Sequence, residues 1–242
     1  MIKFFRKVRK KMLAENKFSK YLLYAIGEIM LVVIGILIAL QINNWNSNRK
    51  NNEFEQSILA DIELELSSNI ERLKKVIDRH EQSHSATEAF IRIFEDSREL
   101  AEVTDDTVNE LLMSMDYNET YDPTSGILES IISSGQINYL KNKELKYLLA
   151  SIDDLTEDAN ESTKAIEAQR PFLLYPSFSK SWIVEDEKIV GYSRKRILHD
   201  PQFRMATYAL YYNFRLQGLK EEKELLETLN NIKSIIEQEK KQ

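Results

Sequence analysis

The sequence predicts an all-α protein, with one N-terminal transmembrane helix followed by an extracytoplasmic antiparallel helical bundle. Three observations predict this class. An apolar stretch with a single charge lies near the N-terminus, and after it apolar side chains recur at spacings of three and four. Glycine and proline are scarce, with 6 and 4 among 242 residues, and they fall at a few places. Long uninterrupted segments of this kind favour helices over strands.

The first element is a membrane span. Residues 22–42 supply the length of roughly 20 residues that a bilayer core of about 30 Å requires. Of these 21 residues, 13 are Leu, Ile or Val, which contribute roughly −4 to −8 kcal/mol to insertion, against about +3 kcal/mol for one charge at the centre. Insertion is therefore favourable even with Glu28 ionised. The stretch is longer than a cleaved signal peptide and has no small-x-small cleavage site, so we expect a retained signal anchor.

The charge distribution predicts the orientation. The first 20 residues carry eight basic side chains and one acidic one, so the positive-inside rule places the N-terminus in the cytoplasm. We expect a basic cytoplasmic segment at 1–20, the transmembrane helix at 21–43 and a periplasmic domain at 44–242, anchored in the inner membrane. Tyr21 and Tyr24 on one side and Trp45 on the other are expected to anchor the span at the two interfaces.

The composition excludes several function classes. After Lys20 the chain holds 25 basic and 38 acidic residues, a net charge of −13, which disfavours binding to nucleic acid. The sequence has no cysteine, which excludes disulfides, thiolate catalysis and cysteine-ligated metals. The remaining two hundred residues are sufficient for one domain with its own core.

The second element is a helix predicted from about Asn48 to Ser97, which would continue the span outward as a stalk. Its stripe of helical period is apolar at the ends and polar in the middle. The stripe comprises Ile58, Ile62, Leu66, Asn69, Leu73, Val76, His80, Ser83, Thr87, Ile91 and Phe94.

Shorter elements follow. Thr104 is expected to start a short helix, and a second one around residues 126–134 is expected to stop at Gly135. Asn142 can cap a helix that ends at Pro171. The segments SWIV (181–184) and KIVGY (188–192) can pair as a small hairpin.

Asp200 and Pro201 form an N-cap and first-turn pair for a long closing helix. Its apolar positions run from Phe203 to Ile236 at helical spacing. These elements together predict an antiparallel bundle whose helices bury one another's apolar faces.

Three stretches carry a family resemblance: the first 46 residues through INNWN, the segment ESIISSGQINYLKNKELKYLL, and DPQFRMATYALYYNF. They resemble a family of single-pass membrane proteins of Bacteroidetes type, known as domain of unknown function 6090. The resemblance implies a cytoplasmic N-terminus, one span and a helical outer domain. It implies no activity, cofactor or catalytic residue.

The segment His80-Glu81-Gln82-Ser83-His84 matches H-E-x-x-H, in which two imidazoles one helical turn apart bind zinc and the glutamate acts as a general base. A third ligand is required, and Glu102 and Glu110 lie downstream. The charged neighbours of the motif instead favour a polar stretch of a solvated helix. We therefore expect no cofactor and no catalytic residue, with a metalloprotease that uses His80 and His84 as the alternative.

Glu28 is the other candidate, because an ionisable residue within a span is a functional hypothesis by default. Helical spacing puts it on one face with Gly35 and Ala39, a small-xxx-small pair of the kind on which transmembrane helices pack. Three alternatives remain open. The carboxylate snorkels from a depth of about 5 Å, it is hydrogen-bonded across a helix–helix contact, or it exchanges a proton.

The leading hypothesis is a non-enzymatic membrane protein whose acidic helical domain is a binding or scaffold module. Its expected partners are membrane lipid, an unknown protein and a second copy of the chain through the span. The alternatives are a component of a proton-coupled membrane machine that uses Glu28 and a zinc-dependent hydrolase centred on HEQSH.

Overall fold

The computed structural model describes residues 18–241, and for residues 18–21 and Tyr24 it describes the backbone alone. Residues 1–17 of the predicted basic segment, and the side chains of Tyr21 and Tyr24, therefore lie outside the described part. The chain divides into two compact units, 1–56 and 57–242. We describe each unit by itself.

The first unit is dominated by α2 (Phe18–Glu95), a helix that also supplies the first element of the second unit. Within the described residues, α2 is the helix that is long and apolar enough to cross a membrane. Its large apolar side chains between Leu22 and Ile42 are all exposed. An exposed apolar surface of this kind suits a membrane anchor.

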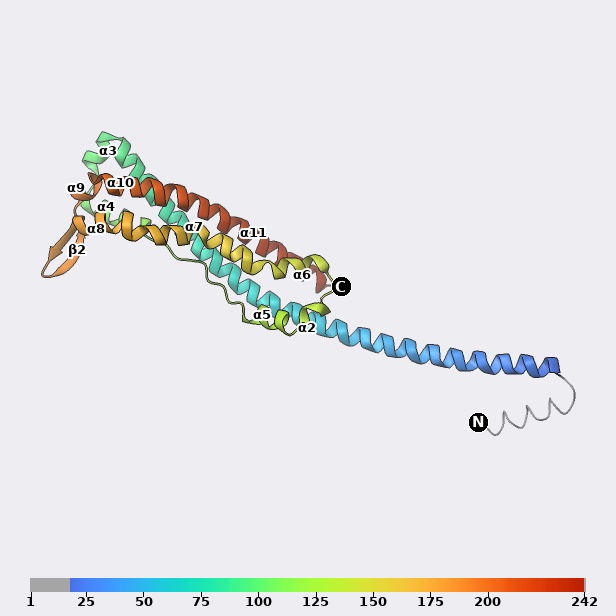
Figure 1. Ribbon diagram of the computed structural model, residues 1–242. Coiled ribbons are helices and arrows are strands. Elements are labelled where there is room, and N and C mark those ends of the chain that lie inside the picture. The colour runs from blue at the N-terminus through green and yellow to red at the C-terminus, as the bar shows by residue number, and fades with distance from the viewer. Residues whose placement is uncertain (1–17, 242) are drawn as a thin grey trace. The chain divides into compact units, whose positions relative to one another are not determined.

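The second unit, residues 57–242, is a helical domain with one two-stranded sheet, so the predicted all-α class is confirmed (Figure 1). After α2, its elements in chain order are α3 (Ser97–Glu102), α4 (Asp105–Met115), α5 (Gly126–Ser133), the 3₁₀-helix η1 (Gln136–Tyr139), α6 (Lys143–Ala150), α7 (Ile152–Leu173), α8 (Tyr175–Ser181), β1 (Trp182–Glu185), β2 (Lys188–Tyr192), α9 (Arg194–Leu198), α10 (Pro201–Ala206), the π-helix η2 (Thr207–Phe214) and α11 (Arg215–Glu239). Helices α7 and α11 run side by side, with the hairpin near α8 and α9 at one end of this unit and α6 near the C-terminus at the other.

The predicted helix starts are confirmed at three positions. The side chains of Thr104, Asn142 and Asp200 each accept a hydrogen bond from a backbone N–H in the first turn of α4, α6 and α10. Such caps satisfy N–H groups that have no partner inside the helix. Gly135 follows α5 with a φ of 73°, the left-handed conformation in which a side chain would be strained.

Two of the predicted helices differ in the structure. The helix expected from Asn142 to Pro171 is broken at Ser151 into α6 and α7, and the Ser151 hydroxyl donates to the Leu148 carbonyl at 2.9 Å. Pro171 does not end α7, which runs on to Leu173. A proline this close to the end removes one hydrogen bond and leaves the rest of the helix intact.

The closing helix also differs from the prediction, because a π-helix, η2, lies between its α-helical segments α10 and α11. Thr207, Leu210 and Tyr211 of this segment are buried. Short π-segments within helices are rare overall, and those that occur frequently lie at functional sites.

The interior of the domain holds two apolar clusters. One extends from Ile58 to Ile77 of α2 and packs on α5, α6 and α11, and the other surrounds Phe90 and Phe203. Between them lies a set of buried polar side chains that we call the polar layer. It consists of His80 and Ser83 of α2, Thr163 of α7, and Arg215 and Glu222 of α11.

Candidate functional site

Residues 116–124, which link α4 to α5, form an extended segment that we call the strap. The strap belongs to no helix or strand, yet Tyr121 in it is only 3% exposed. Backbone groups buried outside regular structure need partners, because an unpaired buried N–H or C=O is costly. The structure supplies these partners from side chains of α2, α7 and α11.

Two asparagines hold the second half of the strap. Asn160 of α7 accepts the Tyr121 N–H and donates to the Tyr121 carbonyl, both at 2.8 Å. Asn69 of α2 accepts the Thr124 N–H at 2.9 Å and donates to the Thr124 carbonyl at 2.7 Å. Each amide thus pairs with the strap as the backbone of a neighbouring strand would.

Arg215 holds the first half of the strap. Its guanidinium is fully buried and donates to the Tyr117 carbonyl at 3.1 Å and to the Asn118 side-chain oxygen. Asn118 in turn donates to the Thr163 carbonyl at 3.2 Å. Burial lowers the pKa of Arg215 to about 10, against the attraction of the Glu222 carboxylate. The group is therefore still a cation at neutral pH.

His80 contacts a different element with each ring nitrogen. Nδ1 lies 2.7 Å from Oε1 of Glu222, and Nε2 lies 3.4 Å from the backbone nitrogen of Glu119. Both contacts are satisfied by the neutral tautomer with the proton on Nδ1. Burial lowers the pKa of His80, although the hydrogen bond that its Nδ1–H donates to Glu222 opposes this shift. The tautomer that fits the contacts is therefore also the charge state that burial favours.

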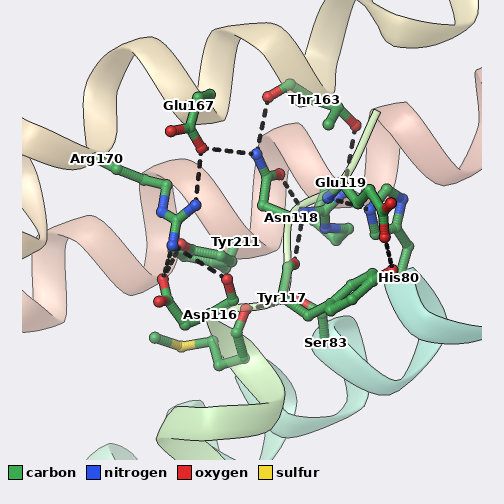
Figure 2. Close-up of polar contacts among 12 residues, drawn as sticks. His80, Ser83, Asp116, Tyr117, Asn118, Glu119, Thr163, Glu167, Arg170 and Tyr211 are labelled. Carbon is green, nitrogen blue, oxygen red and sulfur yellow. Dashed lines mark hydrogen bonds and ion pairs between the residues drawn. The ribbon is translucent and has the colours of Figure 1, made fainter. Parts of the chain in front are cut away.

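An ionic group formed by Arg170, Asp116 and Glu167 fixes the start of the strap, as Figure 2 shows. Arg170 of α7 donates to Asp116 at 2.6 Å and to Glu167 at 2.7 Å. The hydroxyl of Tyr211, a residue of the π-helix, donates to the same Asp116 oxygen at 3.0 Å. Burial raises the pKa of Tyr211, so this hydroxyl remains a donor. The π-helix thus contributes directly to holding the strap.

The β1–β2 hairpin is the other distinctive surface of the domain. The strands pair antiparallel as predicted, with a bulge beside Val184, and Asp186 and Glu187 form the turn with positive φ. Three apolar side chains of the hairpin are more than half exposed, namely Val184, Ile189 and Val190. Apolar side chains gathered on a short exposed hairpin are a feature of interaction surfaces.

The base of the hairpin is attached to the helices on both strands. Asn109 of α4 accepts the Tyr192 N–H at 2.9 Å, and a Cβ on Gly191 would lie only 3.3 Å from its side-chain oxygen. Arg196 of α9 donates to the Trp182 carbonyl at 3.1 Å, and the rings of Tyr192 and Phe178 lie 5.1 Å apart. The hairpin is therefore presented from a fixed base.

The structure separates the two histidines of HEQSH. His80 is buried and bound to Glu222, whereas His84 stacks on Tyr212 at 5.6 Å and lies 3.8 Å from Glu88. The expected solvated position is therefore wrong for His80. Within residues 18–241, no three His, Asp or Glu side chains are grouped to hold a metal ion. The zinc alternative stays a prediction that this geometry does not favour.

The candidate residues of the span all lie on α2. Glu28, Gly35 and Ala39 are seven and four residues apart, which places them on one face of a helix. A Cβ built on Gly35 would meet nothing within 4 Å, so this face has room for another helix. Trp45 is exposed, with the Arg49 guanidinium 5.8 Å from its ring centroid. The packing and proton roles of this face stay predictions.

The strap and its partners are the part of the site that the sequence analysis missed. The available signal was the polar interruption of the α2 stripe at Asn69, His80 and Ser83. A polar residue at a buried helical position requires a hydrogen-bond partner, and here each of the three binds the strap or the end of α4.

These features define the class of the protein. It is an all-α protein that combines one long apolar helix with a helical domain, in which a polar layer secures an extended strap. The chain belongs to a family of unknown function (DUF6090), whose family model matches residues 28–158, more than half of the chain. The predicted family is thereby confirmed. No curated protein and no solved structure matches the chain significantly.

Proposed function

We propose that this protein is a membrane-anchored, non-catalytic binding module that docks a protein partner through the β1–β2 hairpin. In this proposal the apolar part of α2 anchors the chain in the inner membrane. The basic N-terminal segment keeps the N-terminus in the cytoplasm, which leaves domain 57–242 in the periplasm. The predicted contact between copies through Gly35 and Ala39 belongs to the same proposal.

The exposed apolar hairpin is the observation that carries the proposal. Val184 and Ile189 are paired across the strands, and both are more than half exposed, as is Val190. A two-stranded hairpin is marginally stable by itself, and an added strand or an apolar partner surface would cover these side chains. The attachments to Asn109 and Arg196 support the proposal because a fixed base lowers the entropy lost on binding.

The use of the polar groups around the strap also supports a non-catalytic role. His80, Arg215 and Asp116 could serve as acid, base or anion-binding groups in an enzyme. Each is instead engaged with other groups of the protein, His80 and Arg215 with the strap and Asp116 with Arg170 and Tyr211. These contacts give the three groups a structural role, which is to hold the strap in place.

The charge of the hairpin turn indicates the chemistry of the partner. Glu185, Asp186 and Glu187 follow one another at the turn, with Lys188 as the single opposing charge. We expect the partner to present an apolar surface bordered by basic side chains, because complementary charges at a rim favour encounter and fix orientation.

Site-specific photocrosslinking in native membranes tests this function. A photoreactive residue at Val190 should give a discrete adduct with one protein. The same residue at Leu64, which is 71% exposed on α2, is the matched control and should give none. Ile189→Asp should abolish the adduct formed from position 190. Equal adducts from both positions, or an adduct that is unchanged by Ile189→Asp, would exclude the hairpin as the docking element.

A further inference from the structure

His80 connects α11 to the strap through its two ring nitrogens, and the two contacts respond differently to a proton. The Nδ1–H group donates to Glu222, and this bond persists when the ring is protonated. Nε2 accepts the N–H of Glu119, which it can do only while the ring is neutral. A proton on Nε2 would place two donors opposite each other at this point.

We propose that His80 is a proton-operated latch on the strap, closed when the ring is neutral and opened when Nε2 is protonated. In the closed state the Glu119 N–H is held by Nε2. In the open state this contact is lost and residues 117–119 move away from the polar layer. The Glu222 contact remains, so that α2 and α11 stay packed.

The charged and titratable groups around His80 come from two elements. On α11 the Glu222 carboxylate favours a protonated ring and the Arg215 guanidinium disfavours it. On the strap the Glu119 carboxylate favours it, while the ring of Tyr117 lies edge-on to the imidazole at 5.8 Å. Burial has the largest effect and lowers the pKa of His80 below its usual 6.5. The latch is therefore closed at neutral pH and opens in acid.

The strap also contains the group that would stabilise the open state. The Glu119 carboxylate now accepts a hydrogen bond from the Tyr117 hydroxyl. After protonation of His80 this carboxylate can accept a hydrogen bond from the new Nε2–H instead. The partner of Nε2 would then change from the backbone N–H of Glu119 to the side chain of Glu119. Burial raises the pKa of Tyr117 to about 12, so its hydroxyl stays protonated throughout and does not compete for the proton.

Opening would affect the strap more than the helices. The Tyr117 carbonyl and the Asn118 side chain cover the buried guanidinium of Arg215. Movement of residues 117–119 would leave this cation without these two acceptors and would expose it to solvent. The asparagine pairings at Tyr121 and Thr124 lie further along and involve no group of His80. The expected change is therefore local.

Hydrogen–deuterium exchange of the full-length protein tests the latch. Exchange would be measured from about pH 7.5 to about pH 4.5 and corrected for the intrinsic rate. We expect the protection of the amides at 117–119 to fall about tenfold in acid, while the amides of α7 and α11 keep their protection. Constant protection at 117–119 would overturn the proposal, and so would a simultaneous loss across α7 and α11, which indicates global unfolding.

Two variants identify the titrating group. His80→Gln is neutral at every pH, so it should remove the acid step, whereas His199→Gln, at an exposed histidine, should leave it unchanged. Glu222→Gln withdraws the anion that favours the protonated ring, so the step should move to lower pH. If His80→Gln does not fold, Glu222→Gln still tests whether His80 is the titrating group. An acid step that persists in His80→Gln, or that does not move in Glu222→Gln, would contradict the latch.

Discussion

Asn160 and Tyr121 are joined by two hydrogen bonds, although 39 residues separate them in the sequence. The amide of Asn160 accepts the Tyr121 N–H and donates to the Tyr121 carbonyl, both at 2.8 Å. Both residues are buried. A single side chain thus satisfies both backbone groups of the most buried residue of the strap.

Asn160→Ala should lower the free energy of unfolding by about 2–4 kcal/mol, because it leaves a buried N–H and a buried C=O without partners. Urea unfolding of the full-length protein in detergent measures the loss. Asn230→Ala is the control, since its amide donates to a helix carbonyl at an exposed position, and it should change stability by less than about 0.5 kcal/mol. Similar losses in the two variants would show that the pairing contributes nothing specific.

Gly218→Ala should destabilise the domain despite the better helix propensity of alanine. A Cβ at this position would lie 3.2 Å from the Cβ of Ser162, which is fixed to the backbone of α7. Overpacking of about 1–3 kcal/mol then exceeds the gain in propensity, which is about 1 kcal/mol at most. Thermal unfolding measures the net effect.

The control for Gly218 is Gly126→Ala, where a new Cβ meets nothing within 4 Å and stability should not fall. Ser162→Gly should restore stability to Gly218→Ala, because it removes the atom with which the new methyl group collides. Without such a rescue, the close approach of α7 and α11 would not be the cause of the loss.

Stability should fall as the pH drops below about 6.5, with His80 as one identifiable source. Burial lowers the pKa of His80 in the folded state, so below pH 6.5 the unfolded chain binds more protons than the folded chain does. The stabilisation by neutral His80 is therefore fully present when the pH is above the pKa of His80 in the unfolded chain. It is lost as the pH falls to the lower pKa of His80 in the folded chain. Unfolding of the wild type and His80→Gln should give a smaller slope against pH for the variant between these values. Equal slopes would exclude His80.

Gly35→Ile should weaken self-association in the membrane, because a bulky side chain would separate two helices that approach on the Gly35–Ala39 face. Resonance energy transfer between labelled copies in vesicles measures association. Gly27→Ile is the control, since it lies on another face of α2 and likewise meets nothing within 4 Å. Unchanged resonance energy transfer in Gly35→Ile would argue against contact through this face.

Glu28→Gln should be tolerated if the carboxylate only packs against another helix, and it should abolish function if the carboxylate exchanges a proton.

Local chemistry explains why much of the fold could be predicted. The helix starts at Thr104, Asn142 and Asp200 depend on a side chain that bonds to a backbone N–H two or three residues away. The hairpin depends on two short β-prone segments separated by a tight turn. The break at Ser151 and the π-helix η2 were missed because helical periodicity does not distinguish one long helix from two helices in sequence, or an α-turn from a π-turn.

The candidate site was harder to predict than the fold. Asn69, His80 and Ser83 belong to the predicted stripe of α2, and all three are buried. Their partners lie in the strap, in α11 and at the end of α4, up to 142 residues away, and no local pattern indicates them. The expectation that His80 lies in solvent followed from its charged neighbours, which point to other faces of the same helix.

The sequence by itself determined the apolar helix, the all-α class, the capped helix starts and the family, because each depends on composition, spacing or contacts within a few residues. Only the tertiary structure decided that the polar residues of α2 meet Arg215 and Glu222 around the strap. The reason is that a buried polar group must find its partner wherever the packed chain brings one. Which segments meet is decided by how the helices pack against one another.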